Sequence, residues 1–483
     1  MHEKTQEILD IFHKISGIPR CSTNEERIGQ WLEQWGKNNG FTVRKDHAGN
    51  LVINIPATPG SEDKPGIVLQ GHMDMVCEKT PDSDHDFSKD PIRIIHEGDW
   101  LKADKTTLGA DNGIAIGIAL AIAADDTIAH PTLELLFTVD EESGLTGANR
   151  MESGFIHGRI LINIDSEDEG VFTVGCAGGE EIRILLPLNF SSIPDGFKFY
   201  ELTAHGIRGG HSGIDIHKNR ANANKILARA LDLAIHSLPI RLVSFKGGKA
   251  HNAIPREAEA VIACDPAQFP LLQDGIRKFE QTAREEYALT ERTLAFSLSE
   301  TKAGAFDGRV LTPQDTRRVF DLLLALPDGV SRMSPEIEGL VETSNNLATV
   351  EIKENFLSIL SSQRSCVPSR LKEIGSKIKA IASLAGAAAK SGNAYPPWQP
   401  EMTSPLLKRC EKTYQQLFNR NPEVKIIHAG LECGIIGSKY PGMDMISIGP
   451  TIKNPHSPDE KLFIPSIAPV RNFIAELLES YAR

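Results

Sequence analysis

The chain has 483 residues, 40% of them hydrophobic and 24% charged, which is the balance of a globular protein with a sizeable core. Its length suggests two or three domains rather than one. The formal net charge of −12 argues against a general nucleic-acid-binding surface and against binding to an acidic membrane.

Helix and strand patterns alternate in the first part of the chain. Apolar periodicity predicts helices near residues 3–15 and 24–38, and Thr23 or Asn24 is expected to cap the second. A third helix is expected from 113 to 124. Continuous apolar runs predict buried strands at residues 51–55, 67–71, 132–138 and 160–164. This alternation indicates an α/β sheet with helices on its faces.

The middle of the chain follows a different pattern, in which strand, helix, strand and strand occur twice. Helices are expected near residues 217–235, 312–326 and 369–384, and strands at 239–246, 258–263, 346–352 and 355–362. The pattern predicts an inserted α+β domain over residues 184–396, made of two ferredoxin-like halves. Turn-forming residues at 391–400 indicate a linker.

The α/β pattern resumes after this linker, with helices expected at 403–419 and 465–481. Residues 1–183 and 397–483 are therefore expected to form one discontinuous domain, which the inserted domain interrupts in sequence.

Seven cysteines are scattered along the chain without a Cys-x-x-Cys pair. Their odd number and spacing favour free thiols over a disulfide framework or a zinc knuckle. The polar N-terminus lacks the apolar stretch of a signal peptide. The longest weakly polar run, residues 113–124, is shorter than the roughly 20 residues that span a bilayer. We therefore expect a reduced, cytoplasmic protein with neither nucleic acid nor membrane as a partner.

Histidines and carboxylates follow the apolar runs one by one. They are His72, Asp74, Asp111, Glu141, Glu142, Asp165 and the late-loop His456. Because open α/β sheets bind ligands beyond the carboxyl ends of their strands, we expect these side chains to converge. So many oxygen and nitrogen ligands suit two metal ions that share one carboxylate better than a single tetrahedral ion. Asp111, at a loop-to-helix position, is the expected bridge.

The adjacent pair Glu141 and Glu142 is expected to divide two roles. Neighbouring side chains at the end of a strand diverge, so one can reach a metal while the other faces the substrate. A carboxylate facing the substrate can take a proton from water and return it to the leaving amine. Asp74 is expected to accept the second ring N–H of His72. Each pattern is common by chance, as a surface pair or a turn, so the hypothesis depends on their combination.

Five blocks carry a resemblance to a known family: Gly71-His-Met-Asp-Met-Val, Gly109-Ala-Asp-Asn-Gly, Asp140-Glu-Glu-Ser-Gly, Asn163-Ile-Asp-Ser-Glu and Asn454-Pro-His-Ser. In them the chain resembles the metallopeptidase family of aminoacylases, glutamate carboxypeptidases and zinc dipeptidases, and most of all its aminoacyl-histidine dipeptidase branch. The resemblance covers essentially the whole chain. It implies an α/β/α di-zinc aminopeptidase-like catalytic domain with an inserted α+β lid.

The resemblance also implies roles for single residues. One zinc would be held by His72, Asp111 and Asp165, and the other by Asp111, Glu142 and His456. Asp111 would bridge the ions and be followed by a cis peptide bond. Glu141 matches the general base, and Asp74 the catalytic aspartate beside the first histidine. Manganese and cobalt are alternatives, because the same ligands suit them.

Three residues of the inserted domain match lid positions of the family. His211 in Gly209-Gly-His-Ser-Gly matches the histidine that polarises the scissile carbonyl or its oxyanion. Asn252 in His251-Asn-Ala-Ile-Pro matches a substrate-contacting asparagine. Arg364 is a candidate for the substrate's carboxylate, because arginine binds carboxylates bidentately. The alternatives are a turn, a capping residue and a surface charge, respectively.

The segment that begins at His428 departs from the family pattern. His428-Ala-Gly-Leu-Glu-Cys-Gly differs from other branches of the family, so the roles of His428 and Glu432 stay open.

Together these features predict a cytoplasmic di-zinc dipeptidase that acts on unblocked dipeptides, including Xaa-His. A hydroxide shared by the two ions would attack the peptide carbonyl, Glu141 would transfer the proton and His211 would stabilise the oxyanion. The alternatives are a related deacylase, tripeptidase or carboxypeptidase, and a catalytically silent metal- or peptide-binding protein. A homodimer also stays open, and with it whether His211 serves its own active site or a neighbour's.

Overall fold

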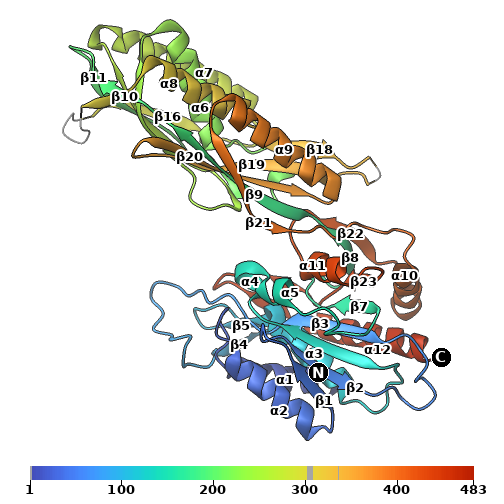
Figure 1. The fold of residues 1–483 in the computed structure, drawn as a ribbon. Coiled ribbons are helices and arrows are strands. Elements are labelled where there is room, and N and C mark those ends of the chain that lie inside the picture. The colour runs from blue at the N-terminus through green and yellow to red at the C-terminus, as the bar shows by residue number, and fades with distance from the viewer. Residues whose placement is uncertain (1–2, 302–307, 336) are drawn as a thin grey trace. The chain divides into compact units, whose positions relative to one another are not determined.

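The computed structural model describes residues 3–301, 308–335 and 337–483 (Figure 1). The chain forms two compact units. Unit 1 comprises Met1–Cys176, Pro400–Ile426 and Leu431–Arg483, and unit 2 comprises Ala177–Gln399 and Ile427–Gly430. Among the described residues, no helix combines the length and the hydropathy that a membrane crossing requires.

Unit 1 is built on an eight-stranded sheet with the order β1-β2-β6-β3-β7-β23-β8-β22. Its strands are β1 (Thr42–Lys45), β2 (Leu51–Ile55), β3 (Ile67–His72), β6 (Leu133–Thr138), β7 (Ile160–Asn163), β8 (Val171–Cys176), β22 (Glu423–Ile427) and β23 (Asp444–Ser447). The neighbours β6, β3, β7 and β23 run parallel. Every residue of β3, β6 and β7 is buried, which explains their mainly apolar sequences.

Helices cover both faces of this sheet. Figure 1 places α1 (Glu3–Ser16), α2 (Glu26–Asn38) and α3 (Ala110–Ala123) on one side, and α4 (Glu141–Gly144), α5 (Thr146–Arg150) and α11 (Glu432–Lys439) on the other. The long helices α10 (Pro405–Phe418) and α12 (Ile467–Ala482) complete the unit. Helix α3 packs tightly against α1, because a Cβ at Gly117 would lie only 3.3 Å from the carbonyl oxygen of Ile8. The α/β sheet predicted from the sequence is thus present.

A smaller sheet of unit 1 presents the late loop that carries His456. Its order is β24-β25-β5-β4, with β4 (Ile94–Glu97), β5 (Trp100–Ala103), β24 (Ile452–Lys453) and β25 (Lys461–Phe463). The loop joins β24 to β25, and His456 within it has a left-handed backbone with φ of 59°.

Unit 2 contains a nine-stranded sheet. Eight strands follow the order β16-β11-β15-β13-β19-β20-β9-β21, and the ninth, β18, pairs with β19. The strands are β9 (Gly178–Pro187), β11 (Lys198–His205), β13 (Arg241–Gly247), β15 (Ala258–Cys264), β16 (Ala295–Glu300), β18 (Gly329–Met333), β19 (Val341–Lys353), β20 (Phe356–Ser365) and β21 (Ala388–Tyr395). The helices are α6 (Ala223–Ser237), α7 (Phe269–Glu286), α8 (Pro313–Ala325) and α9 (Pro368–Leu384). The ferredoxin-like interpretation of each half stays a prediction.

Two local expectations are wrong, and one helix was missed. Helix α2 begins at Glu26, and its N-cap is Glu25 rather than Thr23 or Asn24, with no side-chain cap bond. The segment predicted as a linker, residues 391–400, belongs to β21 as far as Tyr395, and this part of it pairs with β9. Turn-forming residues there are overridden by pairing with a neighbouring strand. Helix α7 was not anticipated, although its buried Leu272, Ile276, Phe279 and Ala283 repeat at helical spacing.

The expectation that all seven cysteines are free thiols is also wrong. Cys21 and Cys77 form a disulfide, with their Cα atoms 5.7 Å apart. The segment before α2 lies beside the segment that follows β3, as the bridge between Cys21 and Met75 shows. This pairing joins residues that are 56 positions apart, so spacing alone could not reveal it. The other five cysteines are buried and lie outside this disulfide.

Candidate metal centre

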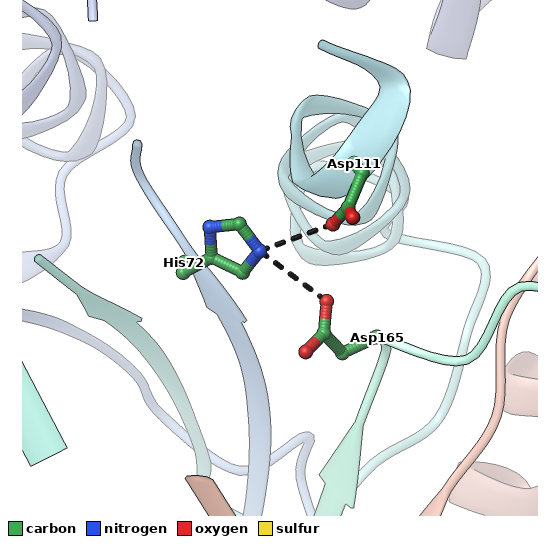
Figure 2. Close-up of side chains that lie close together, drawn as sticks. All are labelled: His72, Asp111 and Asp165. Carbon is green, nitrogen blue, oxygen red and sulfur yellow. Dashed lines mark hydrogen bonds and ion pairs between the residues drawn. The ribbon is translucent and has the colours of Figure 1, made fainter. Parts of the chain in front are cut away.

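The first predicted triad forms where two parallel strands end. His72 is the last residue of β3, and Asp165 follows the neighbouring β7 by two residues. The Nε2 atom of His72 lies 3.1 Å from Oδ1 of Asp111 and 3.4 Å from Oδ1 of Asp165 (Figure 2). The parallel pairing of β3 with β7 therefore brings together ligands that are far apart in the sequence.

The second triad shares Asp111 with the first. The Nε2 atom of His456 lies 3.1 Å from Oδ2 of Asp111 and 3.0 Å from Oε2 of Glu142. The two carboxylate oxygens of Asp111 therefore face two different histidines. This is the arrangement that a carboxylate bridging two metal ions requires.

The chemistry of these donors fits divalent cations. In each triad the ligand atoms lie within 4.8 Å of one another. Among the described residues, Oε1 of Glu142 is buried without a hydrogen-bond partner. Imidazole nitrogens and carboxylate oxygens are ordinary ligands of zinc.

The carboxylates of the site favour positive charge on its two histidines. Burial lowers the pKa of His456, but bonds to Asp111 and Glu142 and the charges of both outweigh burial and raise it to about 11. Burial likewise opposes protonation of His72, yet Asp165, Asp111 and Asp74 raise its pKa well above the ordinary value. Carboxylates that stabilise positive charge this strongly suit metal ions.

The start of α3 is not regular helix. Asp111 and Asn112 have non-helical backbone, and the peptide bond between them is cis, as the family resemblance implied. The Asn112 amide accepts from the backbone N–H of His72 at 3.2 Å and donates to Oδ1 of Asp165 at 2.7 Å. It therefore orients two ligands at once. Asn112 was expected only as the residue that follows the cis peptide bond, and this function was missed.

Glu141 and Glu142 were expected in extended backbone at the end of β6, and this expectation is wrong. They form the first turn of the short helix α4, after Asp140, whose φ is 52°. Consecutive side chains of a helix still point in different directions, since a turn takes about 3.6 residues. The divergence predicted for the pair can therefore arise from helical rather than extended geometry.

Glu141 has the environment of a proton acceptor. Burial raises its pKa well above the ordinary value, and the charges of Asp165, Glu142 and Glu432 add to this effect while His72 opposes it. A carboxyl group with a raised pKa suits proton transfer near neutral pH. Its carboxylate also lies close enough to His72 and Glu142 to act as a metal ligand, so geometry alone does not separate the two roles.

Asp74 joins several parts of the site. Its Oδ1 lies 3.2 Å from Nδ1 of His72 and accepts from the backbone N–H of Glu141 at 3.0 Å. Its Oδ2 accepts from Ser22 at 2.8 Å and from the backbone N–H of Glu142 at 3.2 Å. These bonds outweigh burial and lower its pKa to about 2. Asp74 is thus anionic and fully bonded, as the orientation of a metal-binding histidine requires.

A buried polar network lies beneath the strand ends. Oε2 of Glu432 accepts from Gln70 and from Thr138, each at 2.6 Å, and Gln70 accepts from Asn163 at 2.5 Å. These partners belong to β3, β6 and β7, whose ends supply the ligands. Burial raises the pKa of Glu432 to about 7, although the bond from Thr138 lowers it. No signal in the single sequence assigned Glu432 to this position.

Unit 2 brings two of the lid motifs together. Strand β12 (Gly210–His211) pairs with β14 (Ala253–Ile254), which follows the exposed Asn252. Nδ1 of His211 accepts from the backbone N–H groups of Gly213 at 3.2 Å and Ile214 at 3.0 Å. A neutral ring that accepts at Nδ1 carries its hydrogen on Nε2, so His211 can donate from that atom.

Arg364 lies on β20 and is only 7% exposed, so the alternative reading as a surface charge is wrong. Its Nη1 donates to the hydroxyl of Tyr395 at 2.8 Å, and its Nε is buried without a partner among the described residues. A Cβ at Gly213 would lie 3.1 Å from Cε1 of His211 and 3.3 Å from Nε of Arg364. The His211 ring and the Arg364 guanidinium are therefore neighbours across this glycine.

His428 is buried in unit 2. Its Nε2 lies 2.7 Å from the hydroxyl of Ser344. Burial, with the charge of Arg364, lowers its pKa to about 3, so the ring is neutral at physiological pH.

An α/β sheet whose strand ends carry two histidine–carboxylate triads around one shared aspartate defines the class of metal-dependent hydrolases with a binuclear site. Residues 68–480 match the family described as peptidase family M20/M25/M40, and the chain belongs to this family. It is therefore a metallopeptidase, and the resemblance found in its motifs is confirmed.

Relatives match almost the whole chain. It is 43% identical over 474 residues to the cytosol non-specific dipeptidase of Escherichia coli (strain K12), covering 98% of this chain and 97% of that protein. The crystal structure of aminoacylhistidine dipeptidase from Vibrio alginolyticus matches with a TM-score of 0.89 and 41% identity, covering 98% of this chain and 96% of that chain. Aminopeptidase PepT from Bacillus cereus shares the fold, with a TM-score of 0.59, 16% identity and 99% of both chains covered. The predicted fold class is thereby confirmed.

Proposed function

We propose that this chain is a cytoplasmic dipeptidase with two metal ions, which hydrolyses unblocked dipeptides, including Xaa-His. The observation that carries the proposal is the carboxylate of Asp111, whose two oxygens face the separate histidines His72 and His456. Two relatives named as dipeptidases support the substrate class, because each matches nearly the full length of the chain. Zinc is the proposed metal, and manganese and cobalt are the alternatives.

The residues of unit 1 have different roles in the proposed reaction. When bound, two divalent ions would supply Lewis acidity, which acidifies the attacking water and polarises the scissile carbonyl. Glu141 is assigned to take the proton of the attacking water and to return it to the amine nitrogen that leaves. Asp74 accepts from Nδ1 of His72, which directs the lone pair of Nε2 toward the metal position.

The residues of unit 2 are assigned to bind the substrate. His211 would donate from Nε2 to the oxyanion, since its Nδ1 already accepts two backbone N–H groups. Arg364 would bind the substrate's carboxylate through the buried Nε that has no described partner. Asn252, exposed in the turn before β14, would contact the peptide. Residues 184–396 would then act as a lid that limits substrate length.

A substrate panel tests the proposal. Dipeptides, tripeptides and N-acylated amino acids are offered to the protein with added zinc, manganese or cobalt, and metal-stripped protein is the control. Hydrolysis of unblocked dipeptides is expected with at least one metal and not without. Activity confined to acylated amino acids would favour the deacylase alternative, and activity confined to tripeptides would favour a tripeptidase. Metal binding without any hydrolysis would favour a binding protein.

A further inference from the structure

We propose that Arg20 and Glu460 are positioning residues, which grip the loop Leu108–Asp111 from two sides and so fix the shared carboxylate of Asp111. Neither residue belongs to either triad. The inference rests on the proposed function only in taking Asp111 as a ligand of both metal ions.

Glu460 accepts from four consecutive backbone N–H groups. Its Oε2 lies 2.8 Å from the nitrogen of Leu108 and 3.0 Å from that of Gly109. Its Oε1 lies 2.8 Å from the nitrogen of Ala110 and 3.3 Å from that of Asp111. These donors open α3, where N–H groups have no partner within the helix, and a carboxylate is favoured at such a place.

Glu460 also belongs to the loop that carries His456. It directly precedes β25 and is only 2% exposed. The buried side chain of Glu460 therefore connects the loop of His456 with the loop of the bridging ligand Asp111. A shift of either loop would change the distance between His456 and Asp111.

Arg20 holds the same loop from the other side. One guanidinium nitrogen, Nη2, donates to the carbonyl oxygen of Gly109, while Nη1 donates to those of Met73 at 3.0 Å and Asp74 at 2.8 Å. The side chain is only 1% exposed. Gly109 has φ of 69°, and a Cβ there would lie 2.6 Å from Nη2 of Arg20. Glycine is thus required both by the backbone and by the approach of the guanidinium.

The two buried side chains act on one residue, Gly109. Its N–H donates to Glu460, and its carbonyl oxygen accepts from Arg20. A buried charge is costly unless it is bonded and compensated, so each of these side chains depends on the loop between them. Burial lowers the pKa of Arg20 to about 10, with Glu460 the foremost opposing charge, so the guanidinium stays cationic.

Metal affinity should report this function. Residues that orient metal ligands typically change affinity about 10- to 100-fold when replaced. Glu460→Gln keeps the size of the side chain but turns an amide NH₂ toward N–H donors, which releases part of the loop. Arg20→Lys keeps the charge, but a single ammonium cannot reproduce the planar fork that reaches three carbonyl oxygens.

Glu134→Gln provides a matched control in the same unit. Glu134 is likewise only 2% exposed and accepts from the backbone N–H groups of His157 and Gly158, each at 2.7 Å. It stands near the start of β6, at the end opposite to Glu141. A merely structural effect should lower the melting temperature of this variant as much as that of Glu460→Gln.

The experiment titrates metal-stripped protein with zinc against a chromophoric chelator and records the melting temperature of each variant. Glu460→Gln and Arg20→Lys should bind zinc about 10- to 100-fold more weakly than the parent, while Glu134→Gln should bind it as the parent does. The proposal would be overturned if Glu460→Gln bound zinc as tightly as the parent. It would also be overturned if Glu134→Gln lost as much zinc affinity as Glu460→Gln. If Glu460→Gln does not fold, Glu460→Asp, which keeps the charge but shortens the reach, should show the same weakening.

The result can be separated from the dipeptidase proposal. A parent protein that binds zinc but cleaves no dipeptide, with weaker binding in Glu460→Gln, would support the positioning function and contradict only the substrate. A parent protein that binds none of zinc, manganese and cobalt would overturn both.

Discussion

Glu141 and Glu142 are neighbours in α4, yet two substitutions should separate their functions. Oε2 of Glu142 lies 3.0 Å from His456, within the second triad. Glu141 is instead assigned to proton transfer, in keeping with its raised pKa. We expect Glu141→Gln to keep zinc binding and lose hydrolysis, and Glu142→Gln to lose both.

The magnitude follows from the chemistry that is removed. A positioned general base typically contributes about 10²- to 10⁴-fold to the rate, so Glu141→Gln should lower kcat/KM by that factor. The loss corresponds to about 3 to 5 kcal/mol of activation free energy. Nearly all of it should appear in kcat, since the amide keeps the size of the side chain and the metal ligands are untouched.

The raised pKa of Glu141 also predicts a change in stability. Its carboxyl keeps a proton in the folded protein at pH values where the unfolded chain, with the ordinary value of 4.5, has lost it. The free energy of unfolding therefore falls as pH rises above 4.5. Glutamine does not ionise, so metal-stripped Glu141→Gln should melt no lower than the parent at pH 7.

The assay combines kcat/KM for a dipeptide at saturating zinc with competitive zinc titration of both variants. Hydrolysis by Glu141→Gln at the parental rate would refute the assignment of the base. The reasoning would equally fail if Glu141→Gln lost as much zinc affinity as Glu142→Gln, because Glu141 lies near enough to His72 and Glu142 to be a ligand itself.

Four further outcomes are expected. Burial lowers the pKa of His428 to about 3, whereas the unfolded chain has the ordinary pKa of 6.5. As the pH falls below 6.5, this histidine therefore takes up a proton in the unfolded chain but not in the folded protein. Stability should thus fall by up to about 1.4 kcal/mol per pH unit between pH 6 and 4, and urea unfolding of His428→Asn should show a flatter slope; equal slopes would contradict this. Zinc at 100 times its Kd should stabilise the parent by about 2.7 kcal/mol, and a chelator should reverse the rise in melting temperature. Thiol titration of the unfolded protein should find five thiols without reductant and seven with it, whereas seven in both would exclude the bond between Cys21 and Cys77. Gly71→Ala should destabilise the fold by about 1 to 3 kcal/mol and weaken zinc binding, because a Cβ would lie 2.4 Å from Oδ1 of Asn112; an unchanged melting temperature would show that Asn112 yields without cost.

The strands that support the metal centre could be predicted from the sequence almost residue by residue. The apolar run 51–55 is β2, and the run 67–71 lies within β3. A strand buried on both faces needs mainly apolar residues, and this requirement leaves a nearly continuous local pattern. The candidate ligands could then be expected to converge, because parallel strands place their carboxyl ends at one edge of the sheet.

Elements that depend on distant partners could not be predicted in this way. Ser391, Gly392 and Asn393 are turn formers, yet they lie in β21 because β9 offers its backbone for pairing. Glu141 and Glu142 follow a strand, but a left-handed Asp140 turns the chain into α4 before they occur. In each case the outcome depends on tertiary packing rather than on local propensity.

The sequence by itself determined which residues can hold metal and which strands present them, because burial imposes periodicity and ligand chemistry restricts residue type. Only the tertiary structure decided how those ligands are held. Glu460 meets the N–H of Leu108 across 352 positions of sequence, and Arg20 meets Gly109 across 89. A charged residue has no local signature that separates a solvated surface side chain from one buried among backbone groups. Its function becomes visible only when folding removes the water and brings those groups to it.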